Sequence, residues 1–112
     1  MGEPWFTWSK DGIKTVEGRA NCGSYSKIKK GDTIVWFNDD CGPDRRRYLK
    51  TTVISTKAYK DYPSMLKGEG LRKIIPYKDV KTIKQGETVL HFHCSKETIR
   101  KHGVLAVRYK IL

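Results

Sequence analysis

The sequence predicts an α+β fold, a small and partly closed β-barrel of about five to six strands with short helices beside it. Segments rich in Val, Ile and Thr recur along the chain, separated by Gly, Pro and Asp-Gly turn signals. Short segments with a helical spacing of apolar residues lie between some of these strands. Because closing a sheet removes exposed strand edges, a barrel is the expected arrangement of such strands in one small domain.

The composition predicts a single domain over residues 1–112. With 112 residues, of which 38% are hydrophobic, the chain can bury one core but not two. No apolar run approaches the roughly 20 residues that a membrane helix needs. The amino-terminal residues also lack a signal-peptide pattern. We therefore expect a soluble intracellular protein, in the cytoplasm or the nucleus, without a membrane partner.

The charge of the chain predicts an anionic partner. Lys and Arg number 23 against 12 Asp and Glu, which gives a formal net charge of +11. Nucleic acid is the favoured partner, because clustered cations gain affinity by releasing counterions from phosphates. The alternatives are an acidic protein partner and a charge that only maintains solubility.

The cysteine and histidine residues do not form a recognisable metal site. Cys22, Cys41 and Cys94 are far apart in the sequence, which favours reduced thiols over disulfides or zinc ligands. His91 and His93 share one face if residues 88–93 form a strand, but no third ligand lies nearby. We expect neither a metal nor a cofactor.

The first half of the chain predicts a helix and two strands around a charged motif. The aromatic residues at 5–8 precede Asp11-Gly12, which indicates a short helix ending at Gly12, with its rings in the core or one indole left free to stack on a base. Residues 14–20 predict a strand. Residues 33–38, β-branched and aromatic, predict a strand buried on both faces.

The second half predicts strands alternating with short helices. Residues 49–59 predict a long strand bent near Ser55, and Pro63 begins a short helix that Gly68 and Gly70 end. Glu69, between these glycines, is either directed into a cleft or exposed to solvent. The remaining elements are a helical turn at 71–75, a strand at 88–93, a helix at 96–102 capped by Ser95, and a strand at 104–111.

The strand at 14–20 carries the candidate site. In an extended strand Lys14, Val16 and Gly18 share one face, while Glu17 and Arg19 lie on the other. The missing side chain at Gly18 marks a place where another group comes close. A solvated surface strand is the alternative interpretation.

Two loops supply further cations that could hold a nucleic-acid backbone. The first is glycine-bounded and contains Tyr25, Lys27, Lys29 and Lys30. The second is a predicted hairpin tip with three consecutive arginines, Arg45, Arg46 and Arg47, whose mutual repulsion a phosphate backbone would relieve. A solvated hairpin tip is equally compatible with this pattern.

The order of these motifs resembles the ASCH domain family, whose fold is similar to the PUA barrel of many RNA-binding proteins. The resemblance covers about residues 4–111. It rests on Gly12-x-Lys14-x-x-Glu17-x-Arg19, which matches the family signature G-x-K-x-x-E-x-R, and on the segments 30–34, 65–71 and 103–107. It implies a PUA-like barrel and an RNA-associated role, with the signature strand lining a cleft.

The resemblance also implies an enzymatic alternative. Some small members remove the acetyl group from acetylated cytidine with a Lys, a Thr and a Glu, and ribonuclease activity has been proposed for others. Lys14 and Glu69 match the first and last of these catalytic residues, but Glu17 stands where the threonine would be. We therefore expect RNA binding through Lys14, Glu17 and Arg19 as the main function, with a hydrolase acting on RNA or nucleosides as the alternative.

Overall fold

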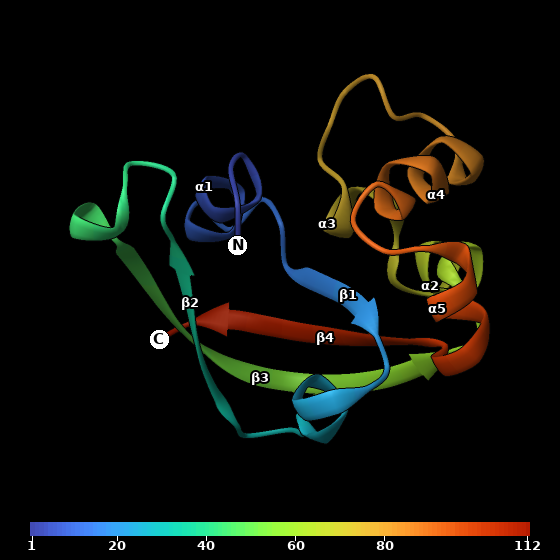
Figure 1. Cartoon of the computed structure of the whole chain (residues 1–112), viewed down its shortest axis with the longest axis horizontal. Helices are drawn as coiled ribbons and strands as arrows, with labels where there is room; N and C mark the ends of the chain where they lie inside the picture. Colours follow the sequence, from blue (N-terminus) through green and yellow to red (C-terminus); the bar gives the residue numbers. More distant parts are fainter.

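The computed structural model describes the whole chain, Met1–Leu112, as a four-stranded antiparallel sheet with short helices (Figure 1). The strands are β1 (Val16–Ala20), β2 (Thr33–Asn38), β3 (Arg47–Tyr59) and β4 (Val104–Ile111), in the order β1-β4-β3-β2. The sheet curls into a half-barrel with two free edges, β1 and β2. The expected α+β class is confirmed, but the expectation of five to six strands is wrong.

The helices lie in two groups (Figure 1). The helix α1 (Trp5–Lys10) lies apart, and the other helices gather together beyond β1. These others are α2 (Tyr62–Glu69), α3 (Leu71–Ile74), α4 (Ile83–His91) and α5 (Lys96–His102). Two 3-10 turns, η1 (Gly23–Lys27) and η2 (Pro43–Arg45), complete the chain. None of the helices is long and apolar enough to cross a membrane.

The hydrophobic core consists of three clusters, of which the smallest is Val53, Leu105 and Val107 in β3 and β4. The larger cluster joins α2, α3, α4 and α5 to β1 and β4, with Met65 and Ile74 fully buried. A smaller cluster joins α1 to the sheet through Phe6, Trp36 and Tyr109. β4 is therefore buried on both faces along most of its length. The expectation that the rings of the first helix enter the core holds for Phe6, which is 2% exposed.

The bend predicted in the long strand is confirmed. The register of β3 against β4 shifts between Val53 and Ser55, so an extra residue is accommodated there. Such a bulge increases the local bend and twist of a strand. β3 can consequently pair with β2 at one end and with β4 at the other while the sheet curls.

Two of the predicted strands require correction. Residues 88–93 belong mostly to α4, because Thr82 and Gln85 form a capping box that begins a helix and outweighs the apparent alternation at 88–93. The strand at 33–38 is an edge strand and is not buried on both faces. Val35 and Phe37 are 50% and 45% exposed on its outer face.

The helix ends follow the predicted capping residues. Ser95 accepts a hydrogen bond from Thr98 N–H at the start of α5. α2 extends further than the predicted Pro63–Lys67, because Asp61 caps its first turn and Gly68 and Glu69 remain helical. Glu69 thus lies at the end of a helix, before Gly70, and not on a free turn.

Gly103 should be the glycine least tolerant of substitution. Its φ of 71° and ψ of −164° lie in a region that only glycine adopts readily, and an added Cβ would lie 2.8 Å from Tyr59 O. Gly103→Ala should lower the free energy of unfolding by about 2 kcal/mol or more. Gly12→Ala is the matched control, because its φ is 75° but nothing lies within 4 Å of the added Cβ. If urea unfolding shows the same decrease in the free energy of unfolding for both variants, this assignment is contradicted.

Candidate functional site

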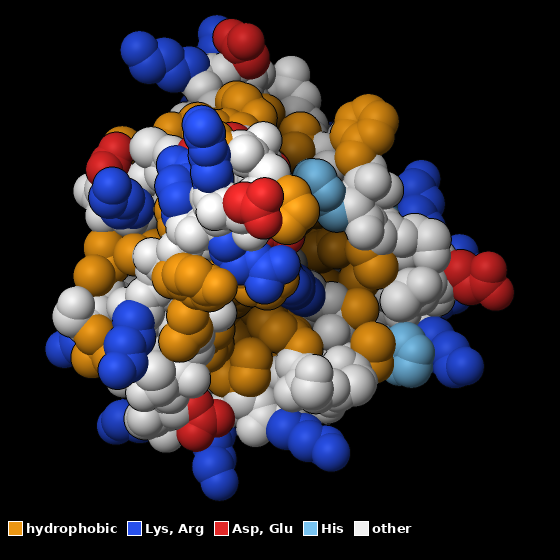
Figure 2. Space-filling model, turned by 60° about the vertical axis from the view of Figure 1, so that its left-hand side comes forward, with side chains coloured by type: hydrophobic (Ala, Val, Ile, Leu, Met, Phe, Trp, Pro, Cys, Tyr) orange, Lys and Arg blue, Asp and Glu red, His pale blue; other side chains and the backbone are white.

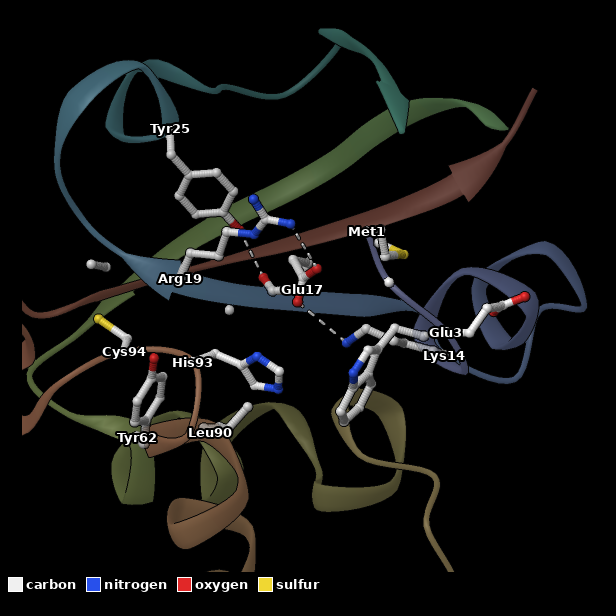
Figure 3. Close-up of a pocket in the computed structure, with 14 residues that line it drawn as sticks. Met1, Glu3, Lys14, Glu17, Arg19, Tyr25, Tyr62, Leu90, His93 and Cys94 are labelled. Carbon is white, nitrogen blue, oxygen red and sulfur yellow. Dashed lines mark hydrogen bonds and ion pairs between the residues drawn. The ribbon is translucent and has the colours of Figure 1, made fainter. Parts of the chain in front are cut away.

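A cavity of about 580 Å³ lies beside β1 and contains most of the signature strand's polar residues. Figure 2 shows one face of the molecule, with basic side chains around its border and a central recess with a hydrophobic bottom. Figure 3 shows the cavity between β1 and the segment that follows α4. Its lining is Met1, Gly2, Glu3, Trp5, Lys14, Glu17, Gly18, Arg19, Ala20, Tyr25, Tyr62, Leu90, His93 and Cys94.

Lys14 is a buried cation held in a fixed position. Its side chain is 1% exposed, and its Nζ donates to Val16 O at 2.5 Å and to Ile74 O at 2.9 Å. Glu17 Oε1 lies 3.6 Å from the same nitrogen. Burial lowers the pKa of Lys14, and the carboxylate of Glu17 opposes that shift. The ammonium therefore has three partners inside the protein.

Glu17 and Arg19 extend this charge pair toward the mouth of the cavity (Figure 3). Arg19 Nη2 lies 3.4 Å from Glu17 Oε2, and the Arg19 side chain is 49% exposed. Its guanidinium carbon lies 5.8 Å from the Tyr25 ring centroid and 5.4 Å from that of Trp36. The result is a row of alternating charge, with one half-exposed guanidinium placed over aromatic rings.

Tyr25 joins the loop after β1 to the strand itself. Its hydroxyl donates to Glu17 O at 3.0 Å. Burial, followed by the nearby Glu17 carboxylate, raises the pKa of Tyr25, so the phenol remains a neutral donor. The structure thus brings Tyr25 together with Lys14, Glu17 and Arg19, four of the residues that the sequence singled out.

Aromatic side chains from the helical side complete the cavity. Trp5 comes from α1, Tyr62 from the start of α2, and His93 from the segment after α4. The Trp5 ring packs edge to face against His93, with centroids 6.1 Å apart. Trp5 lines the cavity, but its ring also packs against Trp8, Tyr77 and the larger core cluster, so it is a partly buried indole and not a free one. Tyr62 and Cys94 were missed as site residues, because only the tertiary fold brings these segments beside β1.

The lysines and arginines of the two loops lie outside the cavity. Lys27, Lys29 and Lys30 do not line it. Arg46 pairs with Asp39 at 2.6 Å, and Arg47 pairs with Glu3 at 2.9 Å. Nearby carboxylates therefore neutralise two of the three arginine charges at the hairpin tip, so their mutual repulsion is weaker than the sequence predicts, and contact of these arginines with a nucleic-acid backbone stays a prediction. Arg45 makes no ion pair.

Glu69 is separated from Lys14. Its carboxylate is buried, accepts a hydrogen bond from Arg108 Nε at 2.5 Å and another from the Tyr59 hydroxyl, and does not line the cavity. Burial acts to raise the pKa of Glu69, but the hydrogen bonds from Arg108 and Tyr59 outweigh it, so the pKa lies below its ordinary value. Glu69 ties α2 to the central sheet and is not part of the Lys14 site.

The histidines and cysteines do not converge on a metal. The structure contains no group of three or more His, Cys, Asp or Glu side chains able to hold an ion. His91 Nδ1 is 2.9 Å from Cys94 O, and its Nε2 is 3.6 Å from Glu87. All three cysteines are free.

Comparison with known proteins identifies relatives over nearly the whole chain. The family model of the ASCH domain matches residues 1–111. The chain is similar to the crystal structure of hypothetical protein PH0355, with 30% identity, a TM-score of 0.83, and coverage of 100% of this chain and 96% of that one. It is also similar to the solution structure of protein PF0455 from Pyrococcus furiosus, with 30% identity, a TM-score of 0.71, and coverage of 100% and 94%. No curated protein matches significantly.

Glu69→Gln should make unfolding less sensitive to acid. Because the folded pKa of Glu69 lies below its ordinary 4.5, its contribution to stability is present above about pH 4.5 and is lost as the pH falls through the folded value. The variant should be less stable at pH 7 but should lose less stability between about pH 5 and pH 2. Urea midpoints across this range test it, with exposed Glu97→Gln as control. If the urea midpoint of Glu69→Gln falls as steeply with decreasing pH as that of the original chain, the assignment is overturned.

Proposed function

The chain belongs to the ASCH domain family, and we propose that it binds RNA by holding a nucleotide of a single-stranded or modified segment in the cavity beside β1. The family is generally associated with RNA. The observation that carries the proposal is the combination of a half-exposed guanidinium with aromatic walls in one recess. RNA-binding proteins recognise unpaired bases by such stacking and polar contacts.

Arg19 is the group best placed to meet a phosphate. It is the cation of the charge row nearest the solvent, because Lys14 is buried behind Glu17. Its contact to Glu17 is long, at 3.4 Å, so a phosphate can compete for the guanidinium. Lys14 then acts indirectly, by fixing the position of Glu17.

The aromatic residues supply the surfaces for a base. Trp5 and His93 line the same cavity as Arg19 and can contact a ring, whereas Tyr62, which is 2% exposed, supports the wall from behind. A cavity of about 580 Å³ falls within the range of about 300–1,000 Å³ typical of small-molecule sites, which suits a single nucleotide. The net charge of +11 adds long-range attraction for an RNA chain.

The geometry supports binding better than hydrolysis. Two donors of the Lys14 ammonium are bonded to main-chain carbonyls and Glu17 Oε1 pairs with its charge at 3.6 Å, so the buried Lys14 is poorly placed to stabilise charge on a substrate. Glu69 is bonded to Arg108 and Tyr59 and does not line the cavity. Glu17 alone remains as a candidate general base.

Arg19→Gln should weaken the binding of a nucleoside monophosphate by about tenfold, because a charge-assisted contact to phosphate is lost. Calorimetric titration at low salt measures the effect. Arg45→Gln is the control, since Arg45 lies outside the cavity and forms no ion pair. Arg45→Gln should leave monophosphate binding unchanged. For a longer single-stranded RNA it should reduce the slope of log affinity against log salt concentration by about one. Equal affinities of the Arg19 and Arg45 variants for the monophosphate would contradict the proposed phosphate contact.

Purified protein should not convert acetylated cytidine to cytidine and acetate, and should not cleave single-stranded RNA. The reason is that neither Lys14 nor Glu69 is free to act on a substrate. Chromatography of the reaction mixture tests both activities. Turnover that disappears in Lys14→Met, in a variant shown to be folded, would instead support the hydrolase alternative.

A further inference from the structure

The free edge of β1 borders the cavity. β1 is the first strand of the sheet and pairs with β4 alone. Gly18 and Ala20 line the cavity. Leu90, His93 and Cys94 line it on the helical side (Figure 3). Main-chain groups on this edge therefore face the recess and have no neighbouring strand to bond.

Hydrogen bonds at the two ends of the β1–β4 ladder show which residues face outward. Tyr109 N–H donates to Thr15 O at 3.1 Å, and Asn21 N–H donates to Gly103 O at 3.0 Å. In an antiparallel pair, residues bonded to the partner strand alternate with residues whose N–H and C=O point away from it. The even-numbered residues of β1, Gly18 and Ala20 among them, consequently direct their N–H and C=O to the free edge.

Two carbonyls on this edge already have partners within the chain. Lys14 Nζ donates to Val16 O at 2.5 Å, and Cys22 N–H donates to Ala20 O at 2.9 Å. The N–H and C=O of Gly18 and the N–H of Ala20 make no hydrogen bond outside the ladder, which does not use them. Gly18 is buried. Buried main-chain polar groups are nearly always paired, so the two Gly18 groups require a partner from outside the chain, and the N–H of the partly buried Ala20 is open to the same partner.

We propose that these three groups bind the Watson–Crick edge of a uracil base, an inference that rests on the RNA-binding function proposed above. Along the strand they present a donor at Gly18, an acceptor at Gly18 and a donor at Ala20. Uracil presents the complementary order of acceptor, donor and acceptor through O2, N3–H and O4. The Watson–Crick edges of cytosine, adenine and guanine match at most two of the three groups.

An extended peptide fits this edge less well than a base. A peptide that binds as an added strand needs the open N–H and C=O groups of several alternate residues along the edge. Here the carbonyls at Val16 and Ala20 are already bonded, so the open Val16 N–H is separated from the others by a bonded carbonyl, and only the three groups at Gly18 and Ala20 are open and adjacent. The cavity also places Trp5 and His93 beside the edge, where a flat ring can contact them.

Nuclear magnetic resonance of the 15N-labelled full chain tests the proposal directly. The probes are uridine 5′-monophosphate and its N3-methyl form, which lacks the N3–H needed by Gly18 O. The amide signals of Gly18 and Ala20 should shift on addition of uridine monophosphate, and N3-methylation should weaken binding by about tenfold or more. Equal affinity for the two nucleotides, or binding without movement of these two amide signals, would overturn the proposal.

A proline substitution provides a second test. Ala20→Pro removes one N–H that the ladder does not use, and proline is tolerated on an edge strand at such positions. It should weaken binding of uridine monophosphate by about tenfold. Val35→Pro is the matched control on the free edge of β2. Because Val53 N–H donates to Asp32 O, the even-numbered residues of β2 bond β3, and the N–H groups of odd-numbered residues such as Val35 point to the free edge. Val35→Pro should leave the affinity unchanged, and equal affinities of the two folded variants would count against the proposal.

The outcomes separate this inference from the function on which it rests. If both nucleotides bind equally and the Arg19→Gln variant still loses affinity, the base contact is wrong but nucleotide binding in the cavity stands. If neither nucleotide nor single-stranded RNA binds, the proposed function fails and this inference fails with it. If Ala20→Pro does not fold, the comparison of the two nucleotides on the original chain decides.

Discussion

The buried ammonium of Lys14 determines how the cavity is built. A cation removed from water requires polar partners, and here they are Val16 O, Ile74 O and Glu17. These contacts join the start of β1 to the end of α3, and Thr15 N–H adds a hydrogen bond to Lys73 O at 3.0 Å. β1 is thereby fixed between β4 on one side and the helices on the other, with its outer edge open to the recess.

Other charged residues mainly connect parts of the fold. Arg47 joins the β2–β3 hairpin to Glu3, and Arg108 joins β4 to Glu69 at the end of α2. Glu3 also lines the cavity, so the hairpin contributes to the recess through this ion pair. A high net positive charge can therefore coexist with few free cations in the site itself, where Arg19 is the guanidinium left half-exposed.

Much of the fold was predictable where local signals determine structure. The Ser95 cap and Gly103 define α5, and the Thr- and Val-rich run with its bend near Ser55 defines β3. The strand predicted at residues 88–93 is a helix for a local reason, because the capping box of Thr82 and Gln85 outweighs an alternation only six residues long. The exposure of β2 could not be foreseen, since strand order is set by tertiary contacts.

The candidate site was only partly predictable for the same reason. Lys14, Glu17 and Arg19 lie within six residues, so their proximity needs no long-range information. The predicted strand placed Lys14 and Glu17 on opposite faces, but β1 begins only at Val16, and Lys14, which precedes it, directs its ammonium to Glu17. The separation of Glu69, and the neutralisation of Arg46 and Arg47, depend on partners 7 to 44 residues away in the sequence. Tyr62 and His93 enter the cavity only because α2 and α4 pack beside β1.

The unpaired edge of β1 has a consequence for how specificity could change over time. Every residue type except proline offers the same main-chain donor and acceptor, so replacing the side chain at Ala20 leaves the pattern intact, whereas an added Cβ at Gly18 would lie 2.2 Å from the buried Met65 Sδ. A one-residue slip between β1 and β4 would do the opposite, because the odd-numbered positions would then turn their amides outward. Gain or loss of a single residue in the flanking loops is thus the kind of mutation able to alter which ligand this family member accepts.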